Sequence, residues 1–139
     1  MTTPGTSMLR SILEILGIVF IRFRPIQRLW GAWLVAVNSA SLLFIGHVEA
    51  QVALAAVGAA LLGQAMIYRR QGFVRVLGVT HVLWVPMLAW MAQRLGAAQA
   101  GAFHAWLVTL MLTNAVSLAI DAWDAARFVR GERAPHYAW

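Results

Sequence analysis

Long runs of apolar residues, separated by short polar segments, divide the chain into five stretches. The runs cover residues 8–23, 29–46, 52–68, 73–93 and 102–124, and the last continues to about residue 130. An α-helix rises about 1.5 Å per residue and the hydrocarbon core of a bilayer is about 30 Å thick, so the four later runs are of spanning length. The pattern predicts an all-α integral membrane protein, in which residues 1–139 form one four-transmembrane-helix bundle.

The first run differs from the other four. Its purely apolar part, Ile15–Ile21, is too short to cross a bilayer, and Ser11 and Glu14 give it a polar edge. We predict an N-terminal amphipathic helix over residues 8–23 that lies in the membrane interface. A cleavable signal peptide is disfavoured because the positive charge follows the apolar segment instead of preceding it, at Arg22, Arg24 and Arg28.

Composition supports the membrane class. Hydrophobic residues make up 61% of the chain and charged residues only 12%, about half the charged share of a typical soluble domain. The chain has no cysteine, which excludes disulfides and thiolate sites. Its net charge of +6 comes from arginines at the ends of apolar runs, so it indicates topology, and no nucleic-acid partner is predicted.

The arginines are unequally divided between the two ends of the predicted bundle. Only Arg94 falls on one side. The other side carries Arg10, Arg22, Arg24, Arg28, Arg69, Arg70, Arg75, Arg127, Arg130 and Arg133. Positive residues remain on the cytoplasmic side, so we expect a multi-pass protein of a bacterial-type inner membrane with both termini in the cytoplasm.

The second predicted span contains many small residues. Ala55, Ala59 and Gly63 follow at four-residue spacing, which lets helices approach closely in lipid. We expect a homo-oligomer formed through this face.

Polar residues inside the spans are the main candidates for function. Placing each span at the centre of the bilayer brings Asn38, His81 and Asn114 to a similar depth. The full set of candidate pathway residues is Asn38, His81, Trp84, Asn114, Ser117 and Asp121. Polar groups are costly in hydrocarbon unless they are paired, so these side chains should meet one another or water.

Two interpretations of this cluster remain open. It is a path for an ion, a proton or a small polar solute, with His81 as a group that titrates near neutral pH. Alternatively, it is a set of interhelical hydrogen bonds. Asp121 and Asp124 have a similar ambiguity: Asp121 is a gate or cation site, or both carboxylates serve as partners for the many arginines.

A further group is expected at the opposite end of the bundle. His47, Glu49 and His104 lie near helix ends, where two imidazoles and a carboxylate could bind a transition metal, or the histidines could ligate haem. The alternative is that they are interfacial side chains in wet loops.

Three classes of function follow from these residues. The first is an oligomeric channel or transporter for an ion or small polar solute. The second is an accessory or anchor subunit of a larger membrane complex that binds haem, quinone or pigment. An enzyme is least favoured, because the chain has no phosphate loop, GxSxG or HExxH motif and no pair of carboxylates placed as acid and base.

Overall fold

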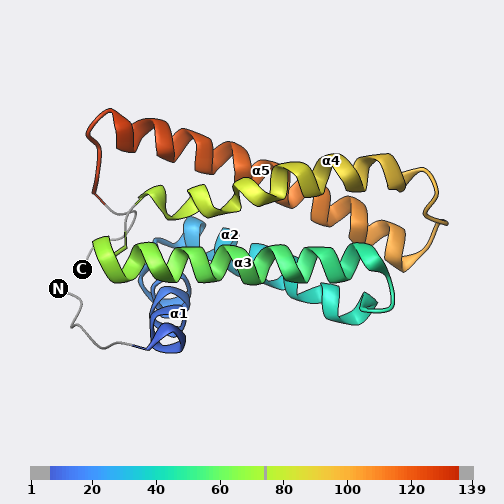
Figure 1. The fold of residues 1–139 in the computed structure, drawn as a ribbon, viewed down its shortest axis with the longest axis horizontal. Coiled ribbons are helices and arrows are strands. Elements are labelled where there is room, and N and C mark those ends of the chain that lie inside the picture. Colours follow the sequence, from blue (N-terminus) through green and yellow to red (C-terminus); the bar gives the residue numbers. More distant parts are fainter. Residues whose placement is uncertain (1–6, 74, 135–139) are drawn as a thin grey trace.

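The computed structural model describes residues 7–73 and 75–134, which fold into helices joined by short turns and contain no strand. In chain order the elements are α1 (Met8–Gly17), η1 (Ile18–Arg22), α2 (Pro25–Ser39), η2 (Ala40–Phe44), α3 (Val48–Gln71), η3 (Arg75–Leu83), α4 (Trp84–Leu95) and α5 (Ala102–Val129). Three long rods, α3, η3–α4 and α5, run alongside one another (Figure 1). The α2–η2 segment packs against α3 and α5, and α1 packs across α3. The all-helical prediction is confirmed.

Among the residues that the structure describes, three helical segments are long and apolar enough to cross a membrane. They are Val48–Gln71, Arg75–Leu95 and Ala102–Val129. Large apolar side chains on all three point away from the protein, among them Leu62, Val82 and Leu112. Such surfaces are compatible with contact to lipid.

The region predicted as the first span is helical but changes its winding. The α-helix α2 ends at Ser39, and Ala40–Phe44 continues as a 3-10 helix. The buried indole of Trp106 donates a hydrogen bond of 3.1 Å to the carbonyl oxygen of Val37. In a continuous α-helix this carbonyl would accept from the amide of Ser41. The contact with α5 therefore accompanies the change from α2 to η2.

The predicted third span also consists of two helix types. The change occurs at Trp84, where the 3-10 helix η3 ends and α4 begins. Pro86 is the third residue of α4. Amides in the first turn of a helix have no partner within that helix, so the missing N–H of proline is tolerated there. Pro86 thus lies at the start of a new helix and not in the middle of one.

The N-terminal segment predicted as one helix over residues 8–23 is α-helical only to Gly17. The Ser7 hydroxyl accepts a hydrogen bond from the amide of Arg10 and caps α1, and Ile18–Arg22 widens into a π-helical turn. Ser11, Ile15 and Ile18 are buried, and α1 packs on α3. Leu9 and Leu13 are exposed on the outside of α1.

Candidate functional site

The 3-10 winding of η3 places three side chains of the site and one glycine in a single row. A 3-10 helix has three residues per turn, so residues three apart in sequence lie one above another. Arg75, Gly78, His81 and the following Trp84 are spaced in this way. In an α-helix each step of three residues would rotate the position by about 60°, and His81 would not share a face with Arg75. The row faces α5, where two aspartates meet it.

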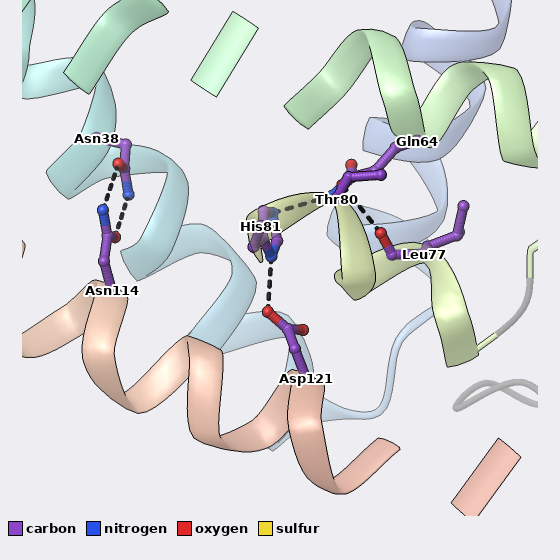
Figure 2. A network of polar contacts seen from close by, with 7 residues as sticks. All are labelled: Asn38, Gln64, Leu77, Thr80, His81, Asn114 and Asp121. Atoms are coloured by element: carbon purple, nitrogen blue, oxygen red, sulfur yellow. Dashed lines mark hydrogen bonds and ion pairs between the residues drawn. The ribbon is translucent and has the colours of Figure 1, made fainter. Parts of the chain in front are cut away.

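His81 and Asp121 form the central contact. The Nδ1 atom of His81 lies 2.7 Å from Oδ2 of Asp121, and both side chains are largely buried, with exposed fractions of 12% and 18% (Figure 2). Gly78 makes this contact sterically accessible. A Cβ atom at Gly78 would overlap the carboxylate of Asp121, so only glycine allows α5 to bring this aspartate so close to η3.

Gln64 completes the site from α3. Its Nε2 atom lies 3.0 Å from Nε2 of His81, so both ring nitrogens are hydrogen-bonded (Figure 2). One residue earlier, Gly63 faces Thr80: a Cβ atom at Gly63 would lie 2.8 Å from Cγ2 of Thr80. Close packing of Gly63 on Thr80 brings Gln64 within reach of His81. Gln64 is not among the residues predicted for the site, although it carries the one side-chain amide within the predicted span 52–68.

Trp84 covers one face of the imidazole. Its ring stacks on that of His81, with centroids 4.0 Å apart and planes inclined by 22°. The indole is 2% exposed, and its N–H has no hydrogen-bond partner among the described residues. Its orientation therefore follows from stacking and packing rather than from a polar contact.

Asn38 and Asn114 form a separate pair. Each amide nitrogen donates to the other side-chain oxygen, at 2.9 and 3.1 Å, and both residues are buried. Asn38 also donates to the carbonyl oxygen of Leu34, at 2.9 Å. Figure 2 shows the amide pair and the His81 site as two groups along α5.

The single cluster expected at one depth is thus divided into two. His81 pairs with Asp121 rather than lying beside Asn114, and Ser117 is buried on α5 between those two positions in sequence. The expectation used the rise of an α-helix for every span, whereas η3 rises about 2.0 Å per residue. The position of a residue within its own span also does not reveal how neighbouring helices are offset along their axes. The side-chain contacts between η3 and α5 establish this offset.

The second aspartate of α5 has an arginine partner. Asp124 lies 3.2 Å from Nη1 of Arg75, and the two side chains are 11% and 9% exposed. In the last turn of α5, Arg127 donates two hydrogen bonds to Glu132, which lies beyond the end of the helix, and this bonding lowers the pKa of the Glu132 carboxyl.

The three residues suggested as metal ligands have other neighbours. Glu49 accepts a 2.7 Å hydrogen bond from Arg94, His47 stacks on Phe103, and Nδ1 of His104 lies 3.2 Å from the Ala98 carbonyl oxygen. Over residues 7–73 and 75–134, no group of three or more histidine or acidic side chains is placed to hold a metal ion. This geometry gives the metal hypothesis no support, and the haem hypothesis stays a prediction.

The predicted small-residue face of α3 is also divided. Ala55 and Ala59 are exposed, but Gly63 packs inward on Thr80. Eight residues of α-helix turn through about 800°, which leaves Gly63 about 80° away from Ala55. Gly58, which is exposed, lies nearer to the outward face.

The chain was compared with protein families, curated proteins and solved structures. No protein-family model, curated protein or solved structure matches the chain.

Proposed function

We propose that the protein is a small membrane channel or transporter whose path for an ion or small polar solute passes through the His81–Asp121 site, with the proton as the best-supported ion. The observation that carries this proposal is the 2.7 Å contact between an imidazole and a carboxylate within two apolar helical segments. Ionisable side chains are costly in a bilayer and are found there mostly where they move or bind ions.

A purely structural role, as a hydrogen bond that holds two helices together, explains the Asn38–Asn114 pair better than it explains the His81–Asp121 contact. The two amides of Asn38 and Asn114 are neutral and satisfy each other, as interhelical hydrogen bonds do. His81 and Asp121 can both change protonation state, and both retain some exposure. A path through the protein therefore follows His81 and Asp121, while the asparagine pair holds α2 and α5 together.

The proposed topology has four spans, with Pro25–Phe44 crossing as a mixed α and 3-10 helix. The C-terminal ends of α3 and α5 lie at the same end of the bundle as α1 (Figure 1). This end carries most of the arginines, so we assign it to the cytoplasmic side of a bacterial-type inner membrane. In this arrangement α1 lies along the cytoplasmic interface, with Leu9 and Leu13 directed to lipid and the Arg10–Glu14 ion pair in the headgroup region.

Self-association is part of the same proposal. The exposed small residues Ala55, Gly58 and Ala59 provide a close-approach surface on α3. A conduit shared between copies would provide more interior than one small bundle encloses.

The test is proton flux into proteoliposomes that contain a pH-sensitive dye. We expect His81→Ala and Asp121→Asn each to reduce flux at least tenfold, while Glu132→Gln, which removes an exposed carboxylate, leaves it unchanged. Each variant is first checked for a monodisperse, helical preparation. Normal flux in both folded site variants, or no flux in the wild-type protein for protons or monovalent ions, would contradict the proposal. A coloured preparation or a stoichiometric partner would instead favour an accessory subunit.

A further inference from the structure

We infer that Nε2 of His81 is a proton-binding position controlled by Gln64, whose side-chain amide must rotate when the proton binds. This inference deepens the proposed function, on which its biological meaning rests. Its test reads the imidazole directly and does not depend on transport.

The hydrogen bonds determine where the ring carries its proton. A carboxylate only accepts, so Nδ1 of His81 donates to Oδ2 of Asp121. Gln64 presents its NH2 group to Nε2 of the ring, at 3.0 Å, so Nε2 accepts and holds a lone pair. This arrangement describes a neutral imidazole with its proton on Nδ1.

Adding a proton to this ring changes what Gln64 must present. The proton binds to the lone pair on Nε2, forms an N–H bond and leaves an imidazolium with two donors. An NH2 group cannot accept from it, so the Gln64 amide rotates by about 180° and turns its carbonyl oxygen to the ring. Protonation at η3 is thereby coupled to a side chain of α3.

The groups that face His81 come from α5, α3 and its own helix. Asp121, on α5, is the ionisable side chain in direct contact, and Gln64, on α3, is neutral. On η3 itself, Arg75 lies two 3-10 turns away and is paired with Asp124 of α5. A carboxylate and a neutral imidazole together carry one negative charge, and proton binding at Nε2 makes the pair neutral.

Trp84 provides a further contact that depends on charge. Its ring lies over the imidazole at 4.0 Å, and the face of an indole attracts a cation. The imidazolium therefore gains from Trp84 an interaction that the neutral ring lacks.

The test is 15N NMR of histidine-labelled protein in lipid nanodiscs, with the His81 signals assigned by their loss in His81→Asn. At a pH where the wild-type ring is neutral, we expect the proton on Nδ1 and a hydrogen-bonded lone pair on Nε2. In Gln64→Glu the new carboxylate can only accept, so both nitrogens should be protonated at that same pH. An opposite charge at hydrogen-bond distance favours the charged ring by about tenfold or more.

Two further variants separate the outcomes. In Gln64→Leu the Nε2 signal should move to the position of a nitrogen without a donor. Gln51→Leu is the matched control: Gln51 lies on the same helix but donates to the Ile45 carbonyl oxygen, so it should leave the His81 signals unchanged. A wild-type ring protonated on Nε2 alone, or signals identical in Gln64→Glu and wild type, would overturn the inference. Correct ring signals without proton flux would contradict only the proposed function.

Discussion

At the scale of single residues, the interior contains two kinds of polar contact that respond differently to substitution. Asn38 and Asn114 can neither gain nor lose a proton in the physiological range, and their two hydrogen bonds use the same pair of amides in both directions. His81, Asp121 and Gln64 form a chain of contacts in which one added proton requires a rearrangement. The first group contributes to stability, and the second can change state.

The asparagine pair should show measurable coupling. Asn114→Ala leaves the buried amide of Asn38 without this partner, so we expect the free energy of unfolding in micelles to fall by about 1–2 kcal/mol. In a double-mutant cycle with Asn38→Ala, the coupling energy should lie between about 0.6 kcal/mol, the average for interhelical hydrogen bonds in membranes, and about 1.7 kcal/mol, the largest value among them. A coupling energy of zero would mean that the pair does not hold α2 to α5.

At the scale of elements, η3 is the segment whose winding the site depends on. Runs of 3-10 helix longer than about four residues are uncommon, yet Arg75–Leu83 keeps this winding throughout. Two aspartates of α5 contact its row, and Gly63 allows α3 to approach from another side. Contacts with neighbouring helices therefore stabilise a winding that isolated peptides rarely adopt.

Gly78→Ala tests this close approach. The added Cβ would overlap the Asp121 carboxylate, so α5 and η3 must separate, and we expect a loss of stability of about 1–3 kcal/mol in thermal unfolding. The perturbed His81 signals in 15N NMR should report the same separation. Gly17→Ala is the control, because Gly17 is helical, a Cβ there meets nothing within 4 Å and alanine is the better helix former. Equal stability of the two variants would contradict the assigned role of Gly78.

At the scale of the whole molecule, charge and apolar surface lie in different places. Apolar side chains cover the outer sides of the long rods, and most arginines lie near helix ends. Different helices are joined by ion pairs at the two ends of the bundle. Arg94 of α4 pairs with Glu49 of α3 at one end, and Arg75 of η3 pairs with Asp124 of α5 toward the other. This distribution suits a protein held at a defined depth and orientation in a bilayer.

The absence of cysteine makes the topology directly testable, because a single introduced cysteine will be the one thiol that reacts with a maleimide. In a four-span protein, an impermeant maleimide applied from outside should label Gly46→Cys and Gly96→Cys but not Ser7→Cys or Gln71→Cys. If Pro25–Phe44 does not cross, Ser7→Cys and Gly46→Cys will label from the same side. Labelling after membrane permeabilisation controls for accessibility.

The all-helical class, the membrane-compatible composition and the polar residues inside the apolar runs can all be predicted from the amino-acid sequence. These properties depend on local composition and on lengths relative to a bilayer. The packing of the helices establishes that Asn38 meets Asn114, that His81 meets Asp121 and Gln64, and that Gly63 faces inward. The reason is physical: partners depend on how helices are rotated and offset, and the 3-10 winding of η3 arises from packing that no single segment encodes.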